Sequence, residues 1–422
     1  MSTARPKLAA VVTTYYKFSH GENIVDRFLY GYGWKGTHYR PPMDVVSLYV
    51  DQVGKGDLSR SRGERFPELR LCPTIAEALT LGGSKLAVDG VVVVGEHGDY
   101  PRNEKGQTEY PRWEFFQQVV KVFKDSQRAV PMFNDKHLSW NWDWAKRMVD
   151  TSRELGFAYM AGSSLPVTWR IPSVEMPLGT PLREALCVGY GGVDSYDFHA
   201  LETIQCMVER RRGGETGVKW VQAYRGEKFW DALRERRWSR RLMEAALCRS
   251  HTLTPAREGF NDILPTDDDL RRLVPDPIAY QYQHNDGLIS TMILFNGLVK
   301  DFNFAAEIEG RREPFSTQMY LPMPDGRTTI ADFFNGLVNN MEKMFLAGKP
   351  TYPVERTLLT TGLVAAGVES LFRQKSHDEN KTEYKFQYPI PPDVAASQEG
   401  RYATPHLAVA YQPARESTFM RA

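Results

Sequence analysis

The chain has 422 residues, 42% of them hydrophobic, which is enough for two domains that each bury a core. Its 53 Lys+Arg against 52 Asp+Glu leave a formal net charge of +1, so no overall field favours nucleic acid or an anionic membrane. The 4 cysteines form no C-x-x-C pair, which argues against a zinc knuckle or a disulfide framework. No apolar run reaches the roughly 18 residues of a membrane-spanning helix. We therefore expect a cytoplasmic protein that binds neither nucleic acid nor membranes.

The first part of the chain, residues 1–155, alternates short apolar segments with stretches of helical period. This alternation is typical of βαβ units, so it predicts a Rossmann-like, doubly wound parallel sheet. A capping box at Thr74–Glu77 opens a helix that continues through Leu81. The expected strands are Lys7–Thr13, Asp44–Tyr49, Leu69–Cys72, Gly90–Val94 and Ala129–Phe133.

The second part, residues 156–422, has many strand-like segments and fewer helices, which predicts an α+β domain with a large open, mostly antiparallel sheet. Helical patterns cover Asp197–Arg211, Phe229–Ala246, Ile330–Leu346 and Glu355–Arg373. The tail Lys375–Tyr402 is expected to be irregular, and His406–Tyr411 can add an edge strand. The expected strands are Phe157–Met160, Glu184–Val188, Val218–Arg225, Ala279–Gln283, Ile289–Phe295, Asn303–Ile308 and Gln318–Pro322.

A turn rich in titratable side chains follows the run of four valines at 91–94. It carries Glu96, His97, Asp99 and Glu104. Ligands of open α/β sheets bind at the carboxyl ends of the strands, so we expect part of a reaction site here. Glu96, His97 and Asp99 are candidate catalytic residues, and Glu104 is a candidate for substrate binding.

Several segments follow one another in an order seen in a known family. Asp51 ends the second expected strand, Asn134–His137 follows the fifth, Gly191–Glu202 forms a glycine-rich turn and helix start, and Pro353–Arg356 precedes a long helix. Together with the stretch Asp57–Leu79, this order resembles the glucose-fructose oxidoreductase, inositol dehydrogenase and MocA (Gfo/Idh/MocA) family. The resemblance implies a Rossmann domain followed by an open antiparallel sheet domain.

The resemblance also implies roles for two residues. Lys136 matches the family's lysine, which reaches the substrate carbinol or carbonyl oxygen, and His199 matches its catalytic histidine. A lysine at a strand's carboxyl end can polarise an oxygen while a nearby imidazole exchanges protons near neutral pH.

The chain departs from the family's pattern at the dinucleotide loop. The first turn, Val11–Gly21, reads VVTTYYKFSHG where a dinucleotide binder shows G-x-G-x-x-G. Asp51, which the resemblance implies as the ribose-binding acid, stands alone. In the glycine-rich turn, Ser195 and Asp197 replace the family's aspartate and glycine. We therefore expect a degenerate loop that disfavours NAD(P).

The expected loops bring an unusual density of histidine and carboxylate together. Such a mixture suits a divalent ion such as zinc or manganese, with His97, Asp99 and His199 as candidate ligands. It suits metal-free acid–base chemistry equally well, and the spacing does not decide between them. Further candidates for substrate binding are His20, His137, Arg170, Asp194, Asp197 and His284.

Three functions stay open. The leading hypothesis is an enzyme that acts on a carbohydrate or other polyhydroxylated small molecule by acid–base chemistry, as a lyase, hydrolase or isomerase. The second is an NAD(P)-dependent sugar or polyol oxidoreductase with an atypical phosphate loop, and the third is a non-catalytic binding protein. Apolar residues on both faces of Ala279–Phe295 and Asn303–Ile308 also predict a homodimer or homotetramer joined through the open sheet.

Overall fold

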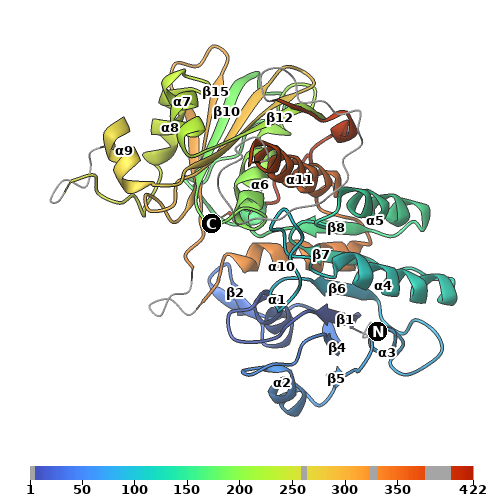
Figure 1. Cartoon of the computed structure of the whole chain (residues 1–422). Helices are drawn as coiled ribbons and strands as arrows, with labels where there is room; N and C mark the ends of the chain where they lie inside the picture. Colours follow the sequence, from blue (N-terminus) through green and yellow to red (C-terminus); the bar gives the residue numbers. More distant parts are fainter. Residues whose placement is uncertain (1–4, 258–263, 324–329, 376–400, 422) are drawn as a thin grey trace.

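The computed structural model describes residues 5–257, 264–323, 330–375 and 401–421. It contains a parallel six-stranded sheet and a mixed eight-stranded sheet, with helices between and around them (Figure 1). The α/β fold class expected from the sequence is confirmed. Within the described residues, none of the helices combines the length and the hydrophobicity needed to cross a bilayer.

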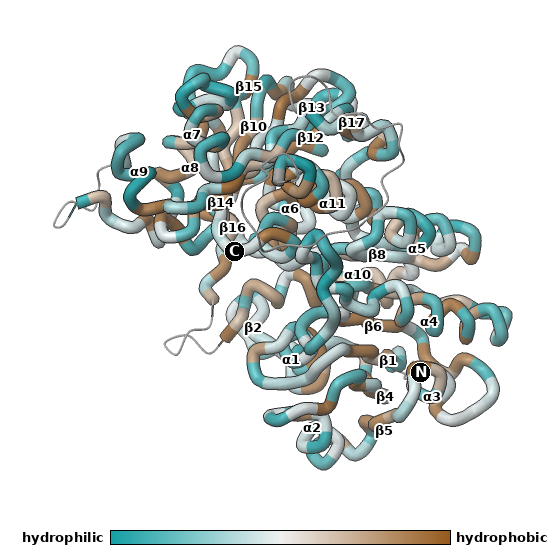
Figure 2. The backbone as a smooth tube through the Cα atoms, in the orientation of Figure 1, coloured by the Kyte–Doolittle hydropathy of each residue, from teal (hydrophilic) through white to brown (hydrophobic). Residues whose placement is uncertain are grey.

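The first sheet has the strand order β5-β4-β1-β6-β7-β8, and every neighbouring pair in it is parallel. The central strand β6 is a fully buried run of glycine and valines, because helices cover both faces of the sheet (Figure 2). The strands are β1 Lys7–Val12, β4 Asp44–Val50, β5 Arg70–Leu71, β6 Gly90–Val94, β7 Met132–Asp135 and β8 Tyr159–Gly162.

Three of the five helices of the first part begin at capping side chains that the sequence supplies. Ser19, Thr74 and Asn141 each accept a hydrogen bond from a backbone N–H in the first turn of their helix. The helices are α1 His20–Leu29, α2 Ser59–Arg65, α3 Ile75–Thr80, α4 Arg112–Ser126 and α5 Trp142–Glu154, and a small hairpin is formed by β2 Tyr32–Trp34 and β3 Thr37–Tyr39.

The second sheet has the order β17-β12-β13-β14-β10-β15-β16-β9. It is antiparallel except where β10 pairs with β14. The strands are β9 Arg170–Ile171, β10 Leu182–Gly189, β12 Val218–Arg225, β13 Ile278–His284, β14 Ile289–Leu294, β15 Phe302–Ile308, β16 Phe315–Met319 and β17 Tyr402–Ala403. A separate two-stranded ladder joins β11 Glu215–Thr216 to β18 Ala410–Tyr411.

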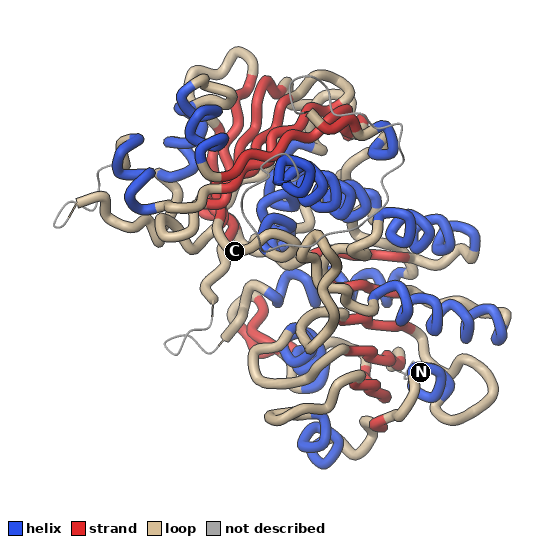
Figure 3. Tube along the Cα trace, viewed as in Figure 1, coloured by secondary structure: helices blue, strands red, loops and turns tan. Residues whose placement is uncertain are grey.

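Helices cover both faces of the second sheet. On the face toward the first sheet lie α6 Tyr196–Val208 and α11 Glu355–Lys375, and α10 Phe334–Ala347 packs against α1 (Figure 3). On the other face, α7 Glu227–Arg234, α8 Arg240–Leu247 and α9 Asp267–Leu273 form a core with the strands. Short 3-10 turns lie at Leu165–Val167 and Pro405–Leu407.

The covered outer face corrects the sequence-based argument for a subunit interface. Ala279, Ile293 and Ala305, which belong to the strands expected to stay open, are completely buried against residues of α7 and α8. The chain therefore supplies its own cover for this face. Assembly as a homodimer or homotetramer stays a prediction, without that argument.

Other expectations differ from the structure in detail. The segment Phe157–Met160 was assigned to the second sheet, but it forms β8 and pairs with β7, so the first sheet extends past residue 155. The expected helix Phe229–Ala246 is broken, because Arg236 adopts a left-handed conformation and Ser239 caps a new helix. The expected strand Gln318–Pro322 forms earlier, as β16. Most of the tail Lys375–Tyr402 lies outside the described residues.

Candidate functional site

A cavity of about 130 Å³ lies where the carboxyl ends of the first sheet's strands meet the second part of the chain. His20 comes from the start of α1, Glu96 and His97 follow β6, and Lys136 follows β7. From the second part, the start of α6 contributes Tyr196 and His199. The sequence-based expectation that these loops converge is met for His20, Glu96, His97, Lys136 and His199.

Lys136 and His199 are in direct contact at the cavity wall. The Lys136 Nζ and His199 Nε2 atoms are 2.6 Å apart, and both side chains are buried. Burial, followed by the charge of Lys136, holds the pKa of His199 well below its usual range. The ring is therefore neutral and accepts a hydrogen bond from the Lys136 ammonium through Nε2, which leaves the proton on Nδ1. Among the described residues, no partner is found for this Nδ1.

Glu96 stands on the other side of Lys136. Its Oε1 is 3.9 Å from Lys136 Nζ, and its Oε2 accepts a hydrogen bond of 2.7 Å from Arg112 Nη2. Burial by itself would raise the pKa of the Glu96 carboxyl, but the charges of Lys136 and Arg112 outweigh it and hold the pKa well below its usual range. Glu96 is thus a permanent carboxylate that steadies two cations, which makes it a poor proton acceptor.

Two further histidines line the cavity beside this pair. His20 Nδ1 is 2.6 Å from the completely buried carboxylate of Asp135, and the His20 ring meets the His97 ring edge-on at 5.2 Å. Burial and the neighbouring His20 lower the pKa of His97 to about 4. His97 is therefore neutral near pH 7, and its Nε2 has no hydrogen-bond partner among the described residues.

Backbone strain is concentrated at this wall. Phe18, His97 and Lys136 all line the cavity, and their φ angles are +69°, +67° and +66°. Residues with a side chain rarely adopt this left-handed region, and such strain gathers at functional sites. Three side chains of the cavity wall are therefore held on strained backbone.

Sequence reasoning missed the apolar part of the wall. Phe333 and Phe334 reach the cavity from the start of α10, and the Phe334 ring meets His20 edge-on at 5.0 Å. These residues lie some 200 positions or more after the motifs at the strand ends, and nothing local to them indicates a site. The other lining residues that the sequence did not single out are Phe18, Asn23, Ser164, Tyr196, Leu321, Met323 and Ala331.

His137 lies behind the cavity wall and does not line it. Its Nε2 is 2.9 Å from Arg112 Nη1 and 4.0 Å from Asp194 Oδ1. Burial, followed by the charge of Arg112, keeps the pKa of His137 well below its usual range. This histidine is therefore a neutral acceptor for Arg112, placed too far back to bind substrate.

Asp194 and Asp197 organise loops away from the cavity. Asp194 accepts hydrogen bonds from Gln107 Nε2 at 2.9 Å and from the Thr108 backbone N–H at 3.0 Å. Asp197 accepts them from three backbone N–H groups at the start of α6 and from the Tyr280 hydroxyl. Burial raises the pKa of Asp194 to about 7 and that of Asp197 to about 6. Their expected role in substrate binding is replaced by a role in holding these turns.

Four other candidate residues also lie outside the cavity lining. Asp99 is exposed, and Glu104 belongs to the same loop farther along. Arg170 pairs with Glu175 and lies over the Phe419 ring, and His284 bonds to Glu215 and Ser290 inside the second sheet. The sequence analysis expected both side chains to reach the site, but Arg170 lies in β9 and His284 ends β13, and each bonds to partners within the second part of the chain, so their assignment to the site was wrong.

The expected metal set is not assembled. His97 and His199 face the cavity, whereas Asp99 is exposed. Across the described ranges, no group of three or more His, Cys, Asp or Glu side chains is placed to hold a metal ion.

The turn that would hold a dinucleotide phosphate is occupied by the chain itself. In a Rossmann fold the pyrophosphate takes the free N–H groups at the start of the first helix. Here Ser19 accepts a hydrogen bond from the Glu22 backbone N–H, and the Glu22 carboxylate accepts one from the Phe18 backbone N–H. The Tyr15 side chain is buried in the turn, and its hydroxyl donates to Asp26 at 2.5 Å. A pyrophosphate placed in this turn would meet the Tyr15 ring and the negative charge of the Glu22 carboxylate.

The acid at the end of β4 is also bonded to side chains of the chain, although it is exposed. Asp51 accepts hydrogen bonds from the Tyr49 and Tyr100 hydroxyls, at 2.7 and 2.8 Å. Next to it, the Gln52 amide donates to the Asp99 carbonyl and accepts from the Asp99 backbone N–H. The β6–α4 loop (residues 95–111) is thereby tied across the end of β4. The side chains along this edge therefore already bond to one another.

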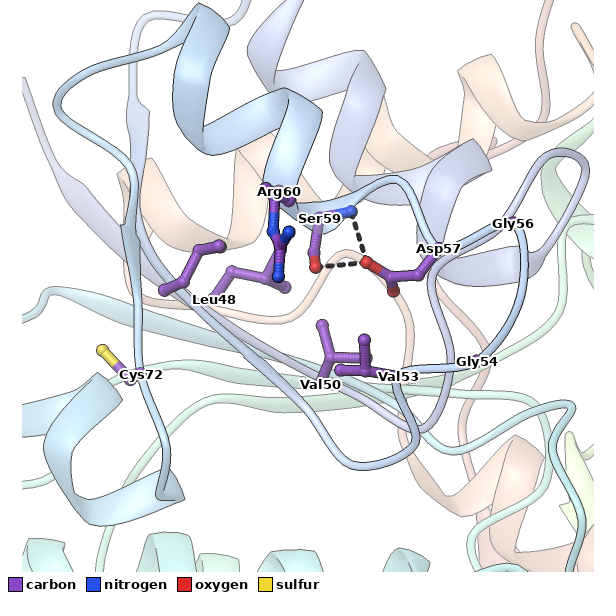
Figure 4. Close-up of a pocket in the computed structure, with 10 residues that line it drawn as sticks. Leu48, Val50, Val53, Gly54, Gly56, Asp57, Ser59, Arg60 and Cys72 are labelled. Carbon is purple, nitrogen blue, oxygen red and sulfur yellow. Dashed lines mark hydrogen bonds between the residues drawn. The ribbon is translucent and has the colours of Figure 1, made fainter.

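A second pocket, of about 460 Å³, lies at the edge of the first sheet between β4, the loop that follows it and α2 (Figure 4). Its walls are mainly Leu48, Val50, Val53 and glycines, and its carboxylate, Asp57, is bonded to Ser59 at the start of α2. It shares no residue with the cavity around Lys136. No cluster of titratable groups makes it a reaction site.

Comparison with known proteins finds similarity of fold. No protein-family model matches the chain, and no curated protein does. GenD2 from gentamicin A biosynthesis, solved with NAD, superposes with a TM-score of 0.53 at 13% identity, covering 90% of this chain and 96% of that one. Myo-inositol dehydrogenase from Lactobacillus casei, solved with NAD(H) and myo-inositol, gives 0.51 at 12% identity, covering 92% and 99%. The chain therefore has the fold of the Gfo/Idh/MocA oxidoreductases, as the resemblance implied.

Proposed function

We propose that the chain is an enzyme that binds a small polyhydroxylated molecule in the cavity and acts on it by acid–base chemistry, without a dinucleotide. A lyase, hydrolase or isomerase reaction fits this chemistry. The observation that carries the proposal is the contact of 2.6 Å between Lys136 and His199 inside a cavity that also holds His97. The proposal extends the shared fold to an activity of its own.

Lys136 and His199 together provide the groups that acid–base chemistry requires. An ammonium group at a strand end donates a hydrogen bond to a substrate carbonyl or carbinol oxygen and stabilises negative charge that develops there. The neutral His199 ring accepts a hydrogen bond from Lys136 and so fixes the direction of its ammonium group. Neutral His97, whose Nε2 has no partner among the described residues, is a second imidazole that lines the cavity. Glu96, already bonded to Arg112, keeps the local charge balanced.

The shape of the cavity supports a polyhydroxylated substrate. Its lining combines the Phe18, Phe333 and Phe334 rings with titratable side chains. Sugar and polyol rings combine an apolar face, which packs on aromatic rings, with hydroxyls that need hydrogen-bond partners. The fold neighbour solved with myo-inositol makes polyols a reasonable class to test.

A second candidate function is an NAD(P)-dependent oxidoreductase. Two fold neighbours were solved with NAD or NAD(H), which favours it. The occupied turn at Tyr15–Glu22 and the bonded Asp51 weigh against it, because both positions are already filled by side chains of the chain. We therefore rank it below acid–base chemistry.

Ligand-detected NMR tests the proposed function directly. Myo-inositol, D-glucose and D-mannitol are mixed with the protein and with the variants Lys136→Met and His199→Asn. We expect saturation transfer to at least one of the polyols, lost in both variants and kept in the exposed control Lys121→Met. A failure of all three to bind, or binding that ignores both substitutions, would contradict the proposal.

A further inference from the structure

Arg112 is a fully buried cation that sits behind the cavity without lining it. Its side chain has no exposed surface, and it enters from the first residue of α4. Burying a guanidinium is costly unless it is paired and hydrogen-bonded. Its two terminal nitrogens bond to Glu96 Oε2 at 2.7 Å and to His137 Nε2 at 2.9 Å. Both partners flank the residues of the cavity, Glu96 next to His97 and His137 next to Lys136.

The backbone is shaped to let this side chain through. A Cβ atom on Gly95 would lie 2.5 Å from Arg112 Cγ, closer than real side chains approach each other. The glycine that ends the valine run therefore leaves room for the arginine stem. On the other side, the guanidinium lies 5.0 Å from the centre of the Tyr110 ring. The passage fixes the direction from which Arg112 reaches Glu96.

We infer that Arg112 is the positioning residue of the Lys136–His199 pair: it binds one oxygen of Glu96 and so keeps the carboxylate at a distance from which it does not displace His199 from Lys136. This inference rests on the proposed role of that pair. Glu96 has two oxygens and two cations next to it. While Arg112 occupies Oε2, Oε1 stays 3.9 Å from Lys136, too far to take the hydrogen bond that Lys136 gives to His199.

Removing the guanidinium frees Oε2. The Glu96 carboxylate can then rotate toward Lys136 and compete with His199 for its protons. The neutral His199 ring would lose the contact that keeps its proton on Nδ1. The position of that proton is therefore a readout of Arg112 that is independent of any substrate.

The experiment is ¹⁵N NMR of the histidine rings in the ligand-free protein, with the His199 signals assigned by their loss in His199→Asn. The charged and titratable groups that face His199 are Lys136, His20, Glu96 and His137. In Arg112→Met we expect the fraction of the Nδ1–H tautomer of His199 to fall at least about twofold. Arg112→Lys, which keeps the charge but not the fork, should fall between the two.

The control is Arg356→Met, which breaks another buried arginine–glutamate pair, with Glu209, outside the cavity. It should leave the His199 signals unchanged, although it costs stability. In Glu96→Gln, adding Arg112→Met should have no further effect on His199, because Arg112 acts through Glu96. If Arg112→Met does not fold, Gly95→Ala displaces the arginine stem without removing its charge and should shift the tautomer in the same direction.

Unchanged His199 signals in folded Arg112→Met or Gly95→Ala would overturn the inference. A shift in Arg356→Met as large as in Arg112→Met would do the same, because it would reveal a general effect of lost stability. Neither result depends on whether polyols bind. The proposed function and the role of Arg112 can therefore fail separately.

Discussion

Single residues show where sequence reasoning reached the site and where it did not. Lys136 and His199 were indicated by a resemblance in motif order, and the structure brings them into contact. Arg112 had no such signal. A single arginine at the start of a helix does not indicate that its side chain packs against Gly95, which lies 17 positions earlier in the sequence. Arg170 and His284 were misplaced because the sequence does not show that Glu175 and Glu215 bind these side chains away from the cavity.

His97 makes a testable contribution to the pH dependence of stability. Its pKa is about 4 in the folded chain and about 6.5 in an unfolded one. The unfolded state thus binds more protons between these values, so the stability that neutral His97 provides is complete above pH 6.5 and is lost as the pH falls toward 4. His97→Asn, which tolerates the left-handed backbone, should remove a loss on the order of 2–3 kcal/mol over this window.

Urea unfolding at pH 7, 6, 5 and 4.5 measures this difference. Asp194 and Asp197, whose raised pKa values act in the opposite direction, are present in both proteins and cancel in the comparison. The exposed His38→Asn is the control and should follow the wild type. Parallel pH profiles for wild type and His97→Asn would show that His97 is not held neutral.

At the scale of elements, the strands and helices that position the site were largely predictable, but the loops between them were not. β6 is a short run of β-branched valines, and Val218–Arg225 is rich in valine and aromatic residues, which is typical of strands. The β6–α4 loop has no periodic pattern. Its path is set by contacts far apart in sequence: Asp99 with Gln52, Gln107 with Asp194, and Lys105 with Glu369.

The two hydrogen bonds between Gln52, which follows β4, and Asp99 of this loop can be tested by amide hydrogen exchange. In Gln52→Ala the Asp99 backbone N–H loses its acceptor and the Asp99 carbonyl loses its donor. We expect exchange of the Asp99 and Tyr100 amides to speed up by about tenfold or more, while β6 keeps its protection. Gln118→Ala, on the exposed face of α4, should leave the loop unchanged. Equal exchange in Gln52→Ala and the wild type would mean that this amide does not hold the loop.

The whole molecule departs from the expected architecture at the outer face of the second sheet. A sequence can show that a strand is apolar on both faces, but it cannot show whether a second subunit or the chain's own helices provide the cover. Here α7 and α8 provide it, and Phe229, Met243 and Ile293 share one core there.

The core between α8 and the second sheet predicts how a substitution there changes the free energy of unfolding. Leu242 of α8 is 2% exposed, so Leu242→Ala should lower the free energy of unfolding by about 2–4 kcal/mol. Because the core lies within one chain, the size of this loss should be the same at low and high micromolar protein. A loss that shrinks as the protein concentration rises would show that subunits meet on this face instead. Arg241→Ala, whose exposed side chain lies next in sequence, is the control.

The central claim is that a Rossmann-like sheet has had its dinucleotide edge filled by the chain's own side chains, leaving a lysine–histidine cavity for acid–base chemistry. Isothermal titration with NAD⁺, NADH, NADP⁺ and NADPH tests it most directly. With Tyr15 and Glu22 in the phosphate turn and Asp51 bonded to two tyrosines, we predict no binding tighter than about millimolar. Binding of any of the four in the micromolar range would contradict the account and favour the oxidoreductase.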